Sequence, residues 1–151
     1  MGNKFVCDVH LGKLARLLRL LGFDTAYENS FTKIELINIS REEERIILSR
    51  DHSLSKNDLS KVIIIEDEEP MLQLKQVIDY LELKNHLRPF SRCLVCNGEL
   101  QTVSKEEISD LIQENTSRYF NVFWKCMNCR RIYWKGSHYE KMLKTIESIT
   151  G

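Results

Sequence analysis

The chain has 151 residues, 42% of them hydrophobic, and 22 basic residues balance 22 acidic ones. This length allows one ordinary domain or a small domain with an added module, and the composition excludes a disordered chain. The zero net charge argues against a protein that coats nucleic acid by bulk charge alone. No apolar run approaches the roughly 20 residues that span a bilayer, and no signal-peptide pattern opens the sequence, so we expect a cytoplasmic protein without a membrane segment.

The chain begins with a strand, an acid and a helix. Residues 5–7 form an apolar run that is typical of a buried strand, and Asp8 follows it directly. Apolar residues then recur at the spacing of one helix face as far as Leu21, and Gly22 is a natural helix end. A second strand is expected near residues 24–27. Because chemistry collects at the carboxyl ends of strands in such sheets, Asp8 is a candidate site residue.

The next elements continue to alternate in type. In chain order, we predict a helix from the capping box Thr32–Glu35, a strand over residues 46–49, a short helical or irregular piece over residues 53–60, a strand over residues 62–65, and a helix from Pro70 to about Leu83. This order predicts an α/β fold, with a mainly parallel sheet and helices on both of its faces.

Acidic residues follow three of these strands. Asp8, Asp51 and Asp67 would share one edge of the sheet, where carboxylates coexist most easily around a divalent cation such as Mg²⁺ or Mn²⁺. Such a metal activates water and neutralises a phosphodiester in the transition state. The alternative is that these acids only form turns and cap helices. Glu35 is a weaker candidate, because its place in the capping box already explains it.

Four cysteines follow a composition change near residues 88–90. Cys93-x-x-Cys96 and Cys126-x-x-Cys129 have the spacing of two zinc knuckles, and four thiolates leave no open position, so we expect a structural Zn²⁺. Buried cysteine pairs or disulfides are the alternative, which a cytosolic chain disfavours. The interval between the knuckles is long enough to carry an element, and the capping box Ser104–Glu107 predicts a helix there.

Basic and aromatic residues interleave around the second knuckle. Single-stranded nucleic acid is recognised by this combination, since bases stack on rings and phosphates bind to cations. The candidate RNA-binding residues here are Arg130, Arg131, Trp134 and His138. The alternative is that the aromatic side chains fill the thin core of the module itself.

With these residues identified, the chain resembles the PIN-like ribonuclease family named for the C-terminal domain of the Mut-seven exonuclease. The stretches that carry the resemblance are residues 8–24, 47–51, 91–100 and 133–139. The resemblance implies a PIN-like nuclease domain (residues 1–88) followed by a zinc-ribbon domain (residues 89–151). It also implies a ribonuclease that depends on Mg²⁺ or Mn²⁺, with Asp8 and Asp51 as its acids.

One position departs from the family pattern. The usual acid at the start of the second helix falls on Lys33, which is expected either to neutralise a carboxylate or to hold a phosphate. Our leading hypothesis is an endonuclease in which Asp8 and Asp51, together with Glu35 or Asp67, hold the catalytic metal. The cations expected to position the RNA backbone are Lys13, Arg16, Arg19 and Arg50. Two alternatives are an inactive RNA- or ribonucleoprotein-binding adaptor and a structural partner in a protein complex.

Overall fold

The computed structural model describes residues 3–56 and 61–150. The first part of the chain contains β1 (Phe5–Cys7), α1 (Gly12–Leu20), β2 (Thr25–Ala26), α2 (Lys33–Glu43), β3 (Ile46–Ser49), β4 (Val62–Ile64) and α3 (Pro70–Tyr80). The second part contains β5 (Leu100–Val103), α4 (Glu114–Tyr119), β6 (Phe123–Cys126), β7 (Ile132–Tyr133) and α5 (Ser137–Thr150). Short 3-10 turns are η1 (Val9–Leu11), η2 (His52–Lys56), η3 (Lys84–His86) and η4 (Glu106–Ile108).

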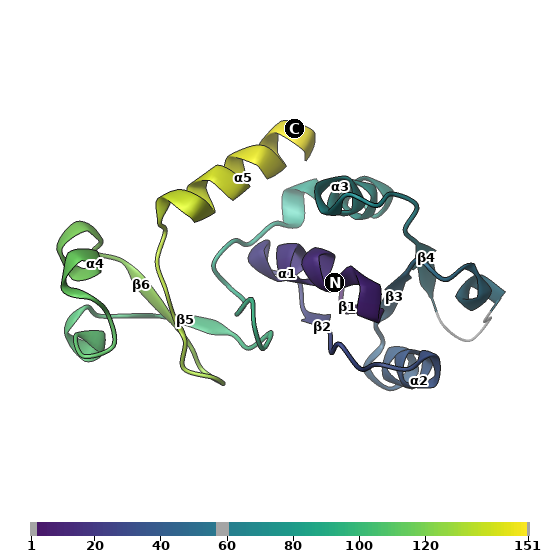
Figure 1. Cartoon of the computed structure of the whole chain (residues 1–151), viewed down its shortest axis with the longest axis horizontal. Coiled ribbons are helices and arrows are strands. Elements are labelled where there is room, and N and C mark those ends of the chain that lie inside the picture. Colours follow the sequence, from purple (N-terminus) through teal and green to yellow (C-terminus); the bar gives the residue numbers. More distant parts are fainter. Residues whose placement is uncertain (1–2, 57–60, 151) are drawn as a thin grey trace.

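The first part forms a parallel sheet of four strands in the order β2-β1-β3-β4, and helices cover both faces (Figure 1). Successive side chains of β1 point to opposite faces. Phe5 and Cys7 belong to the core cluster that includes α1 and α3, whereas Val6 packs with Leu36 of α2. The predicted α/β fold class is therefore confirmed. The predicted helical piece over residues 53–60 begins as η2, and residues 57–60 lie outside the described residues.

Gly22 follows α1 in the chain and lies against Arg88, in the segment that links the two parts. Its φ of 94° lies in the left-handed region, which favours glycine. A Cβ at this position would also lie 2.4 Å from the carbonyl oxygen of Arg88. The neighbouring Leu21 carbonyl accepts a 2.7 Å hydrogen bond from the Arg88 backbone N–H. The linker is thus fixed against the end of α1.

The second part is an antiparallel sheet in the order β5-β6-β7. The helix predicted after Ser104 is wrong: the Ser104 hydroxyl does accept the Glu107 N–H at 3.3 Å, but only the short η4 forms. Ile108 is buried, whereas Leu111, expected on the same apolar face, is 60% exposed. A short helix needs tertiary packing to persist, and a second turn here would bury little.

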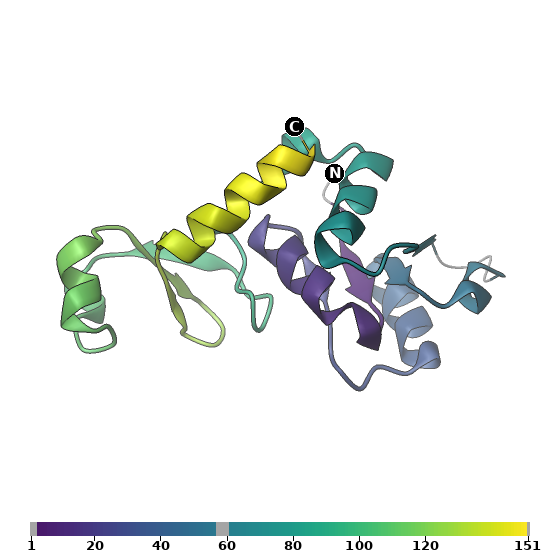
Figure 2. The same ribbon diagram turned by 45° about the horizontal axis from the view of Figure 1, so that its top comes forward.

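Helix α5, which the sequence analysis did not predict, returns from the ribbon to pack on α3 (Figures 1 and 2). Its buried Ile146 belongs to the same core cluster as the leucines of α1. The linker residue Phe90 stacks on Trp124, with ring centroids 4.4 Å apart. The two predicted domains therefore share one hydrophobic core. Within the described parts of the chain, no helix is long and apolar enough to cross a membrane.

Candidate active site and candidate metal centre

Asp8 lies at the carboxyl edge of the parallel sheet, directly after β1. Its carboxylate is 7% exposed and receives three hydrogen bonds. Oδ1 accepts from the His10 N–H at 2.8 Å, and Oδ2 accepts from the Ser49 hydroxyl at 2.6 Å and from the Arg50 N–H at 2.9 Å. The end of β3 therefore fixes the orientation of this carboxylate.

Ser49 connects Asp8 to the second acid of this edge. The same Ser49 hydroxyl that donates to Asp8 accepts a 3.0 Å hydrogen bond from the Asp51 N–H. The Asp51 carboxylate is exposed, and its Oδ1 accepts from the Ser53 N–H at 2.9 Å. Ser49, which the sequence analysis did not identify, thus links the carboxylate of Asp8 to the backbone of Asp51 at one edge of the sheet. That the two carboxylates share a metal ion stays a prediction.

Lys33, the first residue of α2, pairs with Asp51. Its Nζ lies 3.1 Å from Asp51 Oδ2 and also donates to the Ser53 hydroxyl. Hydrogen bonds from Ser53, followed by that from the Lys33 ammonium, lower the pKa of Asp51 to about 2. Of the two roles considered for Lys33, the structure shows the neutralisation of a carboxylate.

Glu35 and Asp67 are used locally and do not join the acids Asp8 and Asp51. Glu35 Oε1 accepts the Thr32 N–H at 3.0 Å, completing the capping box of α2. Asp67 Oδ1 accepts the Glu69 N–H at 2.9 Å, just before α3. In both cases the structure shows the helix-capping or turn-forming alternative, because the carboxylate folds back on its own backbone.

The titration of Asp51 can be checked directly. Because its folded-state pKa of about 2 lies below the ordinary value of about 3.9, the stabilisation is present above pH 4 and is lost as the pH falls toward 2. Lys33→Met is expected to raise this pKa while leaving it below the ordinary value, since the Ser53 hydrogen bonds remain. Carboxyl NMR of the zinc-loaded protein, without added Mg²⁺ or Mn²⁺, measures this pKa. An Asp51 that titrates near 4 in the unsubstituted chain would contradict the pairing.

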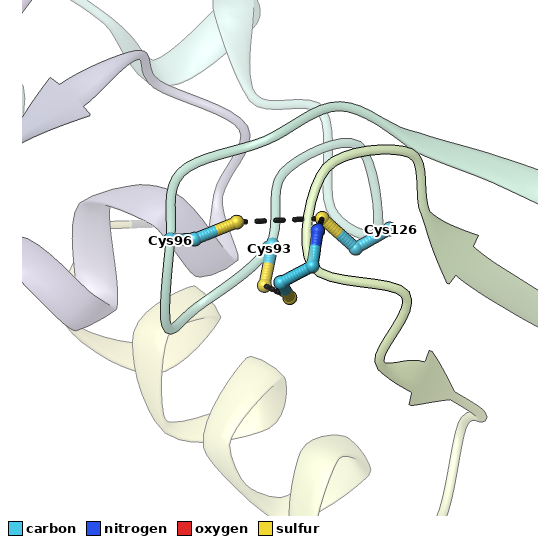
Figure 3. A group of neighbouring side chains, drawn as sticks. Cys93, Cys96 and Cys126 are labelled. Carbon is cyan, nitrogen blue, oxygen red and sulfur yellow. Dashed lines mark hydrogen bonds between the residues drawn. The ribbon is translucent and has the colours of Figure 1, made fainter.

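The four predicted cysteines come together between the two parts of the molecule (Figure 3). Cys93 Sγ lies 3.6 Å from Cys129 Sγ, Cys96 Sγ lies 3.4 Å from Cys126 Sγ, and all four sulfurs fall within 4.8 Å of one another. Tetrahedral Zn²⁺ with sulfurs at about 2.3 Å requires S···S separations of about 3.8 Å. The sulfurs are too far apart for disulfide bonds, so the donor set fits Zn²⁺.

Backbone N–H groups point at the sulfurs, as they do around thiolate ligands. The Gly98 N–H donates to Cys96 Sγ and the Asn128 N–H to Cys126 Sγ, each at 3.4 Å. Burial alone would raise the pKa of Cys96, but hydrogen bonds from the Asn128 amide and the Gly98 N–H lower it to about 6. A Cβ on Gly98 would lie 2.8 Å from Cys126 Sγ, so only glycine leaves room there.

The comparison with protein families decides the classification. The family described as the Mut7-C RNAse domain matches residues 3–146, which is nearly the whole chain. The chain belongs to the Mut7-C RNAse domain family. Comparisons with curated proteins and with solved structures gave no match. The family resemblance inferred from the sequence is thus confirmed, and it supports a ribonuclease-type function with RNA as the substrate class.

Arg19 of this Mut7-C chain has a structural position that the sequence analysis did not foresee. It was predicted to contact RNA, but it is 6% exposed. Its Nε donates to the Thr25 carbonyl at 2.9 Å, and its Nη1 donates to the carbonyls of Leu94 and Val95, each at 3.1 Å. Arg19 therefore joins α1 and β2 to the first knuckle, and its guanidinium is not presented to a ligand at the surface.

The other predicted RNA-binding residues divide into exposed and engaged groups. Exposed side chains are those of Lys13, Arg16, Arg130, Arg131 and His138. Of these, Arg131 is also engaged, because its side chain hydrogen-bonds to Cys129 of the quartet. Arg50 is half-buried and donates to the Asp67 carbonyl, and Trp134 packs edge-on against Phe123.

Most of the ribbon's aromatic rings pack inside the Mut7-C chain. Phe123 and Tyr133 are buried, and Trp124 stacks on Phe90. The alternative in which these rings form a thin core is therefore the one that the structure shows for them. Tyr133 also supports the metal centre, because its hydroxyl lies 3.0 Å from Cys93 Sγ and accepts the Leu94 N–H at 3.2 Å.

A catalytic Mg²⁺ or Mn²⁺ would find two carboxylates on this chain. Within residues 3–56 and 61–150, the cysteine quartet is the only group of three or more His, Cys, Asp or Glu side chains close enough to hold a metal ion. Mg²⁺ is nevertheless usually bound by one or two carboxylates together with substrate phosphates. Asp8 and Asp51 are the two carboxylates that would hold such an ion at the carboxyl edge of the sheet.

Proposed function

We propose that this chain is a metal-dependent endoribonuclease that hydrolyses RNA phosphodiesters at the edge formed by Asp8 and Asp51. The observation that supports the proposal is that the Ser49 hydroxyl is hydrogen-bonded both to the carboxylate of Asp8 and to the backbone of Asp51. The chain that contains this arrangement belongs to the Mut7-C RNAse domain family. A bound Mg²⁺ or Mn²⁺ would supply a water of lowered pKa and neutralise charge on the phosphate. Asp8 and Asp51 would hold it.

The residues of the chain have separate roles in this proposal. Asp8 is held rigidly by three donors, whereas Asp51 is exposed and paired with Lys33. With RNA bound, Lys33 would exchange its ion pair with Asp51 for one with a phosphate, which would free the Asp51 carboxylate to hold a metal ion. Lys13 and Arg16, on the exposed side of α1, bind neighbouring phosphates of the backbone. The ribbon binds RNA through Arg130, Arg131 and His138.

Asp8→Asn is expected to lower the rate of RNA cleavage roughly 100-fold, a loss of about 2.7 kcal/mol of transition-state stabilisation. The amide keeps the shape of the side chain and an acceptor for Ser49, but removes the charge that holds the metal. The measurement is cleavage of a circular single-stranded RNA with Mn²⁺, because only an endonuclease opens a circle. Asp110→Asn, which changes an exposed acid of the ribbon, is the matched control and is expected to keep full activity.

The second candidate function is a non-catalytic RNA-binding adaptor, and the Lys33–Asp51 ion pair favours it. In this function the lysine permanently replaces the metal as the partner of Asp51. The same experiment separates the two candidates. Tight RNA binding without cleavage, in any of Mg²⁺, Mn²⁺, Co²⁺ or Ca²⁺, would establish the adaptor, and equal cleavage by the unsubstituted chain and Asp8→Asn would remove Asp8 from the site.

A further inference from the structure

A polar cavity lies at the edge of the parallel sheet opposite to Asp8 and Asp51. It has a volume of about 590 Å³ and is lined by residues that precede β1 and β2, such as Lys4 and Asp24, together with Arg88 of the linker and Arg92 before the first cysteine. Because the strands are parallel, this amino edge is the end of the sheet away from Asp8 and Asp51. The cavity is therefore separate from the proposed cleavage site.

The lining concentrates positive charge in a chain whose net charge is zero. Lys4, Arg88 and Arg92 face this cavity with Asp24 as the single carboxylate in its lining. That carboxylate is already paired, since Asp24 Oδ1 accepts from Arg45 Nη1 at 2.8 Å and from Asn97 Nδ2 at 2.7 Å. Arg45 does not line the cavity and also pairs with Glu43, so it compensates the charge of Asp24 only in part. Three cations against this one carboxylate leave the lining cationic.

Two of the three cations are available to a ligand. Among the described residues, the side chains of Lys4 and Arg88 form no hydrogen bond or ion pair, while the backbone of Arg88 is fixed through Leu21 and Ser91. Arg92 is instead held in place: its Nη1 donates to the Asn97 carbonyl at 3.2 Å, and its Nη2 lies 3.9 Å from Asp24. One fixed guanidinium and two unpaired cations thus surround the same space.

We propose that this cavity binds a phosphate ester, either as a free nucleotide or as a phosphate of RNA. Guanidinium groups bind phosphate oxygens bidentately and a lysine ammonium adds a point charge, so the three cations match this chemistry. The amides of Asn3 and Asn85 also line the cavity and offer donors and acceptors to a sugar or base. The volume is that of a small-molecule site. The inference does not depend on cleavage at Asp8.

The test is titration of the full zinc-loaded chain with inorganic phosphate, 5′-AMP and a fluorescent single-stranded oligonucleotide of RNA. The lining variant is Lys4→Glu with Arg88→Glu, and the matched control is Lys141→Glu with Lys144→Glu, which reverses two exposed charges on α5 that do not line the cavity. We expect the lining variant to bind at least one ester probe tenfold more weakly than the control does. Weakened AMP binding identifies a nucleotide, and weakened RNA binding alone identifies the RNA backbone.

Two results would overturn the proposal: no probe binds at millimolar concentration, or the lining variant and the control bind every probe equally. The neutral variant Lys4→Gln with Arg88→Gln guards against misfolding, and it is expected to unfold at the same temperature as the unsubstituted chain while losing affinity. RNA cleavage by these variants is measured at saturating RNA and tests the proposed function of Asp8. The proposal for the cavity and the proposal for Asp8 can therefore be contradicted independently.

Discussion

Removal of zinc is expected to destabilise the whole molecule, including the nuclease part. Cys93 and Cys126 are fully buried in the core cluster that contains α1 and α3. Structural Zn²⁺ contributes about 10–16 kcal/mol of apparent binding free energy in small modules, which is similar to the whole stability of a typical domain. We therefore expect a chelator to lower the unfolding temperature by more than about 10 °C in one transition, measured by calorimetry.

Single substitutions separate zinc loss from a general effect of cysteine replacement. Cys93→Ser is expected to reproduce the effect of the chelator and to abolish the stoichiometric zinc of the purified chain. Cys7→Ala is the matched control, since Cys7 is buried in the same core but lies outside the quartet. Cys7→Ala is expected to lower the free energy of unfolding by about 1 kcal/mol and to retain the bound zinc. Two separate transitions, the later one unaffected by the chelator, would show that the parts fold independently.

Arg19→Met is expected to lower the free energy of unfolding by about 3 kcal/mol or more. The substitution keeps the apolar stem of the side chain but leaves the carbonyls of Thr25, Leu94 and Val95 without their charged donor. Hydrogen bonds from a charged group are worth roughly 1.5–3 kcal/mol each, and buried acceptors without partners add a desolvation cost. The measurement is denaturant unfolding of the zinc-loaded chain.

Arg16→Met tests whether the effect belongs to the buried position. Arg16 lies three residues before Arg19 on α1 but is exposed, so that its loss is expected to change stability by no more than about 0.5 kcal/mol. RNA affinity is expected to rank the two variants the other way round. Arg16→Met weakens RNA binding directly, whereas Arg19→Met weakens it only to the extent that it unfolds the protein. Equal stabilities of the two variants would contradict the role assigned to Arg19.

Local sequence patterns predicted much of the fold and of the candidate site. Local interactions between residues close in the chain determine the strands at residues 5–7 and 46–49 and the capping box at Thr32. Such interactions can be recognised from the sequence alone. The placement of Asp8 and Asp51 after neighbouring strands, at one edge of the sheet, followed from one topological rule for parallel sheets. Paired CxxC motifs predicted the quartet for a similar reason, because metal geometry restricts which cysteines come together.

What the sequence did not reveal depends on contacts between distant residues. The spacing of Tyr139, Met142, Leu143 and Ile146 is that of one helix face, but the interleaved aromatic and basic residues nearby drew attention to RNA binding instead. Arg19 reads as a surface residue on α1, because its partners Leu94 and Val95 lie more than 70 positions away. The helix expected after Ser104 had a correct start signal, but beyond the buried Ile108 the next turn has little surface to pack against, and Leu111 is exposed.

The contacts around Thr25 also bear on how the chain avoids self-association. β2 is an edge strand, and the N–H and carbonyl groups along such an edge can pair with a strand of another molecule. In this chain the Thr25 N–H donates to Asn97 Oδ1 at 3.0 Å, and the Thr25 carbonyl accepts from Arg19. Asn97 directly follows Cys96, so the metal centre that organises the knuckle also covers the edge. We therefore expect a chain without zinc to uncover this edge for strand addition, so that aggregation through β2 would compete with refolding.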